Sequence, residues 1–146
     1  MSKPSVYVAT AYSNRVMAQV AIDLLKRRGF EISHDWTNES MDGKEGAALT
    51  RYLRRCADDD VNGVLAADLV FFINHKLARG ACVELGIAIG QMKPIIVADV
   101  EAQHNIFFSL KGDGYGPIWT YQTMEGALRR AKKFAKAWDR GQRKFR

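Results

Sequence analysis

Glu84 is a single carboxylate inside an apolar stretch, and it is the residue most able to carry chemistry. The surrounding residues, 80–91, predict a helix that is apolar almost all round and therefore packs against a sheet. A buried glutamate is costly unless it is paired or used in a reaction. The residues three and four positions away on the helix are mostly small, so a ligand has room to approach the carboxylate.

A second carboxylate is available from the run Asp58-Asp59-Asp60, which precedes a buried strand predicted over residues 69–73. If a helix reaches that strand, the eight residues between them rise about 12 Å and bring Asp60 back toward Glu84. Glycosidic-bond chemistry needs two carboxylates: one attacks the anomeric carbon and the other protonates the leaving group. An exposed acidic cluster is the alternative, because periodicity does not show which aspartate points inward. Asp68, which opens the strand, is expected to be a structural cap or turn residue.

The elements that must position these groups alternate between strand and helix along the whole chain. Strands are predicted over 6–10, 30–35, 69–73, 94–98 and 117–121, and helices over 14–28, around 49–56, over 80–91 and over 124–138. This predicts a single α/β domain over residues 1–146, a flavodoxin-like three-layer fold whose parallel sheet has about five strands in the order 2-1-3-4-5. Ligands bind such sheets outside the carboxyl ends of the strands, where the strand order reverses. Residues 10–15 and 74–80 would line that crevice.

Both of these loops lead into predicted helices with an arginine nearby, in Ser13-Asn14-Arg15 and Ala78-Arg79-Gly80. Helix N-termini and arginine favour anions such as phosphate. Simple N-capping beside a surface arginine explains the same residues equally well. The three histidines, His34, His75 and His104, show no metal-ligand spacing, so we do not expect a metal site.

The net charge of +6 is concentrated at the C-terminus. Residues 129–146 carry nine Lys and Arg against one Asp, so the other 128 residues sum to −2. We interpret 124–138 as a docking helix with a solvated basic outer face, and a nucleic-acid role of this tail is the weaker alternative. Cys56 and Cys82 are expected to be reduced core residues. With no signal peptide and no apolar run long enough to cross a membrane, the sequence predicts a cytoplasmic protein.

Several motifs taken together resemble the nucleoside 2-deoxyribosyltransferase-like family, which includes enzymes that hydrolyse nucleoside 5′-monophosphates. They are Val6-Tyr7-Val8-Ala-Thr10-Ala-Tyr12-Ser-Asn-Arg15, Asp60-Val-Asn-Gly-Val-x-x-x-Asp68, and Gly80-x-x-x-Glu84-Leu-Gly-x-Ala followed by Lys93-Pro. The resemblance covers roughly residues 5–98. The Glu-Leu-Gly block with its upstream Asp is the more specific part.

The resemblance implies cleavage or exchange of the N-glycosidic bond of a (deoxy)nucleoside or its 5′-monophosphate, with no metal or cofactor. Glu84 would attack C1′ and form a glycosyl-enzyme intermediate, Asp60 would serve as acid and then base, and Tyr7 would orient Glu84. The resemblance further implies a homo-oligomer, a dimer or larger, in which a neighbouring subunit completes the site. Residues expected to bind substrate are Tyr12, stacked on the base, with Thr10, Arg15, Arg79 and Gly80 of the crevice loops and Asn105 or Ser109 from segment 103–116.

One position departs from the family pattern. Six residues before the glutamate the family commonly has Asp or Ser, which contacts the sugar or its phosphate, whereas this chain has Ala78. Arg79 and Arg15 therefore favour a phosphorylated substrate, and hydrolysis over transfer. A non-catalytic nucleotide-sensing domain on the same fold is the alternative from another functional class.

Overall fold

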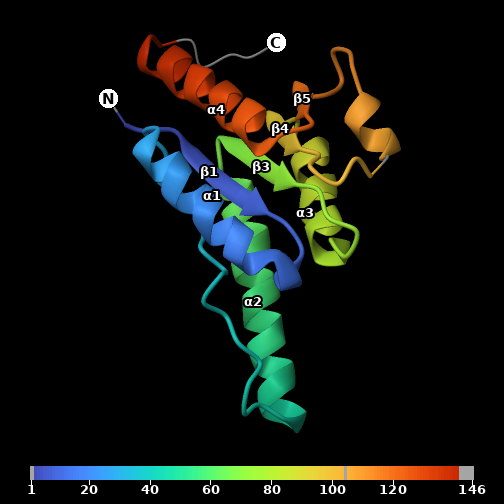
Figure 1. Cartoon of the computed structure of the whole chain (residues 1–146). Coiled ribbons are helices and arrows are strands. Elements are labelled where there is room, and N and C mark those ends of the chain that lie inside the picture. The colour runs from blue at the N-terminus through green and yellow to red at the C-terminus, as the bar shows by residue number, and fades with distance from the viewer. Residues whose placement is uncertain (1, 104, 142–146) are drawn as a thin grey trace.

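The structure is a computed structural model that describes residues 2–103 and 105–141. A five-stranded parallel sheet has the order β2-β1-β3-β4-β5 (Figure 1). Its strands are β1 (Ser5–Ala9), β2 (Glu31–Ile32), β3 (Leu69–Ile73), β4 (Ile95–Ala98) and β5 (Ile118–Tyr121). The helices are α1 (Arg15–Arg27), α2 (Gly46–Ala66), α3 (Arg79–Gly90) and α4 (Met124–Asp139), with two short 3₁₀ helices, η1 (Tyr12–Asn14) and η2 (Ile106–Ser109). The predicted α/β fold and its strand order are confirmed.

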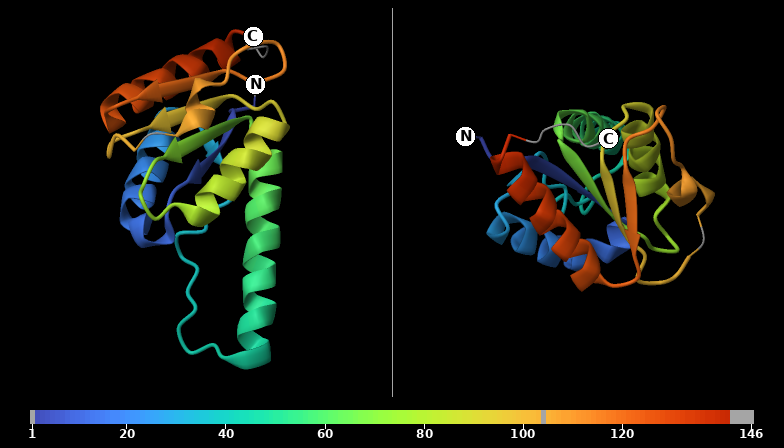
Figure 2. Two further views of the ribbon diagram at one scale, coloured as in Figure 1. Left: turned by 90° about the vertical axis from the view of Figure 1, so that its right-hand side faces the viewer. Right: turned by 90° about the horizontal axis from the view of Figure 1, so that it is seen from above.

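The sheet lies between two layers of helices, α1 with α4 on one face and α2 with α3 on the other (Figure 2). All five residues of β3, Leu-Val-Phe-Phe-Ile, are buried, as expected for a central parallel strand covered on both faces. α4 turns Ala127, Leu128, Ala131, Phe134 and Ala135 toward the core. Its basic residues are exposed except Arg130, which is half-buried over the Trp119 ring. The N-terminal half of α2 extends beyond the other helices, with the loop that follows β2 running beside it (Figure 2).

Three local expectations need correction. The second strand is only two residues long, Glu31–Ile32, because residues 33–45 leave the sheet as a loop that packs on other elements. α3 is not buried all round: Val83 is 65% exposed and Cys82 is also exposed. Cys82 is therefore not a core cysteine, and Cys56 is only half-buried. α3 packs on the sheet through small residues on one face, and its other apolar face meets solvent.

The two ends of the described chain lie close together: the Trp138 indole N–H donates to the carbonyl oxygen of Ser2 over 3.1 Å. Among residues 2–103 and 105–141, no helix has the length and apolar character that crossing a membrane would require.

Candidate active site

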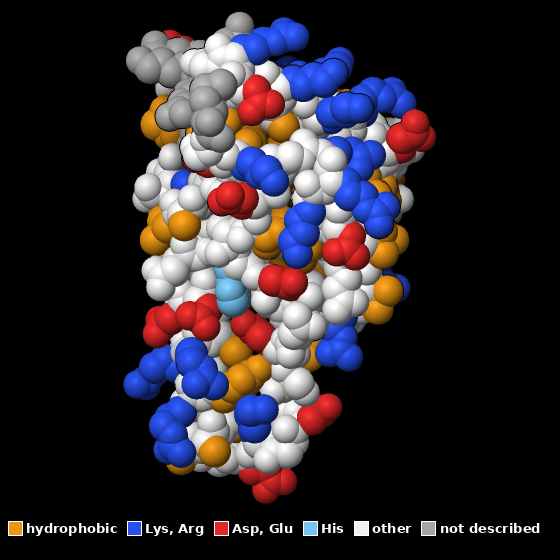
Figure 3. Space-filling model, turned by 90° about the vertical axis from the view of Figure 1, so that its left-hand side faces the viewer, with side chains coloured by type: hydrophobic (Ala, Val, Ile, Leu, Met, Phe, Trp, Pro, Cys, Tyr) orange, Lys and Arg blue, Asp and Glu red, His pale blue; other side chains and the backbone are white. Residues whose placement is uncertain are grey.

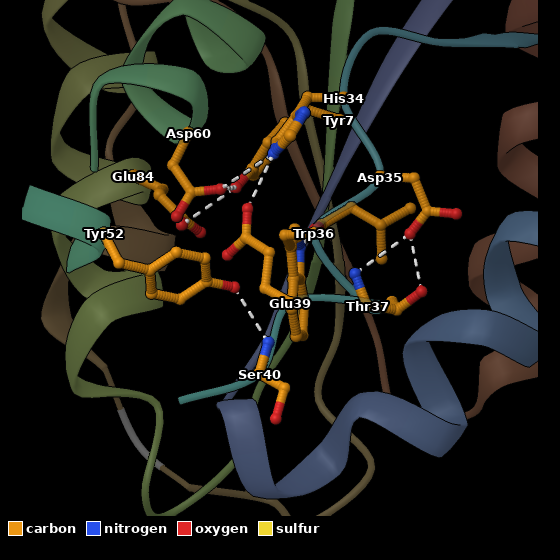
Figure 4. Close-up of polar contacts among 11 residues, drawn as sticks. Tyr7, His34, Asp35, Trp36, Thr37, Glu39, Ser40, Tyr52, Asp60 and Glu84 are labelled. Carbon is orange, nitrogen blue, oxygen red and sulfur yellow. Dashed lines mark hydrogen bonds and ion pairs between the residues drawn. The ribbon is translucent and has the colours of Figure 1, made fainter. Parts of the chain in front are cut away.

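The hydroxyl of Tyr7 stands between two carboxylates from different helices. Its oxygen lies 2.8 Å from Asp60 Oδ1 and 3.0 Å from Glu84 Oε1 (Figure 4). Tyr7 belongs to β1, Asp60 to α2 and Glu84 to α3. The structure thus brings together the three residues that the sequence nominated as catalytic, from positions as far as 77 residues apart.

The close packing of α2 against β1 depends on Gly63, which lies one helical turn after Asp60. A Cβ atom at this glycine would lie 2.7 Å from the Cβ of His34 and 2.9 Å from Cε2 of the Tyr7 ring, closer than atoms pack. The Tyr7 ring and His34 occupy the space that a side chain at position 63 would need. Gly63 therefore sets where the Tyr7 hydroxyl meets Asp60.

Glu84 has few hydrogen-bond donors for a buried carboxylate. Its Oε2 atom is buried and has no hydrogen-bond partner. Burial, followed by the nearby charge of Asp60, raises the pKa of Glu84 to about 8, against the opposing effect of the Tyr7 hydrogen bond. Raised pKa values of this kind, with a specific charged partner, are typical of functional sites.

The two short contacts of the Tyr7 hydroxyl cannot both be hydrogen bonds if Asp60 and Glu84 are both ionised. A phenol hydroxyl has one hydrogen, so Tyr7 can donate to only one of its two carboxylate neighbours. Its second short contact is a hydrogen bond only if the other carboxyl is protonated. Burial also raises the pKa of Asp60 and of Tyr7 above their ordinary values. The geometry therefore fits one proton held on the pair of carboxyls near neutral pH.

The loop after β2 adds two groups that the sequence reasoning missed. His34 Nε2 lies 3.2 Å from Glu39 Oε1 and 3.6 Å from Asp60 Oδ1, so the site contains a third carboxylate and an imidazole (Figure 4). The indole N–H of Trp36 donates to the carbonyl oxygen of Val8 over 2.8 Å and fastens this loop to β1. In Figure 3, acidic side chains surround a histidine near the middle of the face that carries this loop.

The spacing of these residues does not indicate a site, because His34 falls in the predicted strand 30–35 and Glu39 in the polar connection that follows it. The usable signal was their position. The carboxyl end of the second strand lies at the same edge of the sheet as those of β1 and β3, so the loop that leaves it borders the same crevice.

The residues predicted in the first crevice loop lie beside this second loop. Tyr12 is half-exposed; its hydroxyl donates to the carbonyl oxygen of Glu39 over 2.8 Å and accepts from Arg15 Nη1 over 2.8 Å. The Tyr12 and Trp36 rings are 6.5 Å apart. Thr10 is buried and donates to the carbonyl oxygen of Ile73, which ties the ends of β1 and β3 together. Thr10 is thus committed to a structural bond in this structure.

Arg79 and Gly80 begin α3 and are both exposed. Ala78 occupies the N-cap position, is 4% exposed and provides no side-chain cap. A methyl group there cannot accept the hydrogen bonds that an N-cap oxygen usually takes. The N-terminus of α3 therefore presents backbone N–H groups without a capping side chain, next to an arginine.

Asn105 and Ser109 are not brought to the carboxylate pair within this chain. They belong to η2, which contacts β5 at the far edge of the sheet. The Asn105 side chain accepts from the backbone N–H of Phe107 over 3.0 Å, which is a capping role. A contribution of segment 103–116 to a neighbouring subunit's site stays a prediction, and His104 lies outside the described residues.

His34, Glu39 and Asp60 offer three ligand atoms within 4.8 Å of one another, a grouping that sequence spacing did not indicate. These residues come from two segments and could hold a cation. His34 and Glu39 already form a hydrogen bond with each other, however, and Asp60 also contacts Tyr7.

One group of basic residues lies on the opposite face of the sheet, and others, such as Arg51 and Arg54, lie on α2. A surface cleft of about 490 Å³ lies between α1 and α4 and is lined by Arg27, Arg28, Gly29, Lys132, Ala135, Lys136 and Asp139. Lys and Arg side chains are concentrated at the top of Figure 3, over α4. Residues 142–146 of the predicted basic tail lie outside the described residues. The basic surface and the carboxylate site are therefore separate features.

No family model matches the chain, and comparison with curated proteins finds no match. Among solved structures, the fold is similar to that of the CMP N-glycosidase BcmB from Clostridium botulinum, with a TM-score of 0.58 and 19% sequence identity over 89% of this chain and 98% of that one. It is also similar to the solution structure of BlsM, with a TM-score of 0.63 and 16% identity over 97% of this chain and 95% of that one. At the level of the fold, these likenesses agree with the resemblance that the sequence motifs indicate.

Proposed function

We propose that this protein cleaves the N-glycosidic bond of a (deoxy)nucleoside or its 5′-monophosphate through a covalent intermediate on Glu84. The observation that carries the proposal is the single Tyr7 hydroxyl that joins Asp60 and Glu84 at the predicted crevice. The similarity in fold to a protein named as a CMP N-glycosidase supports the same class of reaction. A similar fold does not by itself establish an activity, so the proposal depends on the arrangement of Tyr7, Asp60 and Glu84.

The spacing of the two carboxylates supports a double displacement. Both contact one hydroxyl oxygen, so the two contacting oxygens are no farther apart than the two hydrogen bonds together, about 5.8 Å. Enzymes that form a glycosyl intermediate hold their carboxyl groups roughly 5–5.5 Å apart, whereas direct attack by water needs roughly 6.5–9.5 Å. This spacing supports a role for Glu84 as a nucleophile rather than as a base for water.

In the proposed reaction, an ionised Glu84 oxygen bonds to C1′ while the bond from C1′ to the base nitrogen breaks. The electron pair leaves with the base, and its nitrogen takes the proton of Asp60. Water then gives a proton to Asp60 as its oxygen attacks C1′ and releases Glu84. A second base in place of water would give exchange. We infer that the uncapped N-terminus of α3, with Arg79 and Gly80, receives a 5′-phosphate.

The test is chromatography of the four deoxynucleosides and their 5′-monophosphates after incubation with the protein, with and without a different free base. Wild type should release or exchange a base, and Glu84→Gln should lower the rate at least about a thousandfold. Glu125→Gln is the matched control, because that carboxylate is 83% exposed on α4, on the other face of the sheet.

Two results would overturn the proposal. Base release that persists in Glu84→Gln would exclude Glu84 as the nucleophile. Binding of nucleotides without turnover by wild type would favour the sensing domain. Binding of nucleic acid that weakens steeply with salt, is lost on deleting residues 139–146 and does not depend on Glu84 would instead favour a nucleic-acid role of the basic C-terminal tail.

A further inference from the structure

Glu39 brings a third carboxylate next to the proposed reacting pair, and its backbone is held on both sides. Its N–H donates to the carbonyl oxygen of Trp36 over 3.0 Å, and its own carbonyl oxygen accepts from the Tyr12 hydroxyl over 2.8 Å. The next residue, Ser40, donates its N–H to the Tyr52 hydroxyl over 2.8 Å. These hydrogen bonds fix the backbone position of Glu39 within its loop.

This placement works against the ionisation of the other two acids. The charge of Glu39 contributes to the raised pKa values of both Asp60 and Glu84, in addition to the effect of burial. A glutamine would fill the same space without this repulsion. The Glu39 side chain remains 23% exposed and has His34 as a hydrogen-bond partner. A carboxylate accepts about four hydrogen bonds, so capacity remains for a ligand that supplies donors.

We propose that Glu39 selects bases that carry an exocyclic amino group on the edge opposite the sugar, as cytosine and adenine do. This inference rests on the proposed function, because it takes the base to lie with its glycosidic nitrogen at Asp60. Asp60 and Glu39 both approach His34 Nε2, at 3.6 and 3.2 Å, so they are close enough for one base to touch both. An amino group donates to a carboxylate, whereas the oxo group of uracil or hypoxanthine turns an oxygen lone pair toward it and is repelled.

Two matched substrate pairs isolate this contact. dCMP and dUMP differ in this exocyclic group and in the ring nitrogen beside it, which is an acceptor in dCMP and an N–H donor in dUMP; dAMP and dIMP differ in the same way. Wild type should favour the amino member in kcat/KM by about tenfold to a hundredfold. Glu39→Gln should bring the ratio close to one, since a glutamine amide can present either a donor or an acceptor. Loop contacts that use the Glu39 backbone survive this change, and circular dichroism verifies the fold. Asp42→Asn is the matched control, an exposed carboxylate of the same loop, and should leave the ratio unchanged.

Failure of this inference differs from failure of the proposed function. Turnover with equal kcat/KM for amino and oxo members, or a preference that Glu39→Gln leaves intact, would overturn the role of Glu39 while leaving the N-glycosidase proposal in place. If wild type turns over none of the four nucleotides, calorimetric titration with dCMP and dUMP decides the question. Tighter binding of dCMP that is lost in Glu39→Gln would support the inference, and equal affinities would overturn it.

Discussion

Two carboxylates beside the sheet, Asp68 and Glu84, have opposite surroundings. Asp68, at the start of β3, accepts from both the backbone N–H and the hydroxyl of Ser5, over 2.9 and 3.0 Å. Glu84, on α3, shares one tyrosine hydroxyl with Asp60 and leaves its second oxygen buried without a partner. Asp68 joins β1 to β3. Glu84 reaches β1 only through the hydroxyl of Tyr7, which it shares with Asp60.

The contrast separates a structural acid from a reactive one. A carboxylate that stabilises a fold is given donors, because desolvation is costly without them. A carboxylate poised for attack must remain short of donors, since each hydrogen bond it makes in the resting protein must be weakened before it bonds to carbon. The raised pKa of Glu84, about 8, is the electrostatic sign of that shortage.

The largest effect on stability should come from Glu84→Gln at alkaline pH. The pKa of Glu84 is raised in the folded state from 4.5 to about 8. The stability that depends on its neutral form is therefore complete below pH 4.5 and lost as the pH rises through 8. Glutamine does not ionise, so the variant avoids this loss. At about 1.4 kcal/mol per pKa unit, urea unfolding at pH 9 should show a gain of up to about 5 kcal/mol.

The same measurement at pH 4 provides the control for Glu84→Gln, since both proteins are then neutral at this position and should be nearly equal in stability. A gain of the same size at pH 4 would mean that glutamine simply packs better. The contrast with Asp68 would then lose its electrostatic basis.

Gly63→Ala attacks the packing that places the Tyr7 hydroxyl between the two acids. The added methyl group would meet His34 and the Tyr7 ring at under 3 Å, so one of them must move. We expect a loss of about 1–3 kcal/mol in unfolding free energy, as for overpacked cores, together with slower base release. Gly86→Ala is the control, because its Cβ enters open space on α3. It should be neutral or stabilising by up to about 1 kcal/mol. A stable, fully active Gly63→Ala protein would show that the close packing at Gly63 is not required for the site.

The fold and Glu84 could be predicted from sequence because their signals are local, whereas the choice of Asp60 and Tyr7 came from the family resemblance. Buried runs such as Leu69–Ile73 and the isolated Glu84 in an apolar helix are visible without tertiary structure. Glu39 and His34 were missed because their role depends on how a loop leaves a two-residue strand and returns over β1. No periodicity records that path. The exposed face of α3 was missed because apolar composition does not distinguish the core from a surface awaiting a ligand or partner.

Asp68→Asn should act in the opposite direction to Glu84→Gln. Losing the negative charge weakens the bonds from Ser5, and we expect a loss of about 1 kcal/mol at neutral pH with base release unchanged. A double-mutant cycle with Ser5→Ala measures the coupling between the two residues directly. A zero coupling energy would place the role of Asp68 elsewhere, for instance with Lys93, whose pKa its charge affects.

The smallest expected effect is a shift in the pH dependence of kcat/KM. The reacting form needs Glu84 ionised and Asp60 protonated, which is one proton on the pair. Activity should therefore fall above about pH 8, where that proton is lost, rather than rise as Glu84 ionises. The charge of Glu39 raises the pKa values of both acids, so Glu39→Gln should move the alkaline limb to lower pH by a fraction of a unit. Deoxynucleosides are the substrates for this measurement, because they carry no titrating phosphate. Activity that increases through pH 8 would show that Asp60 need not hold a proton, and would leave Glu84 as the only acid whose ionisation limits the reaction.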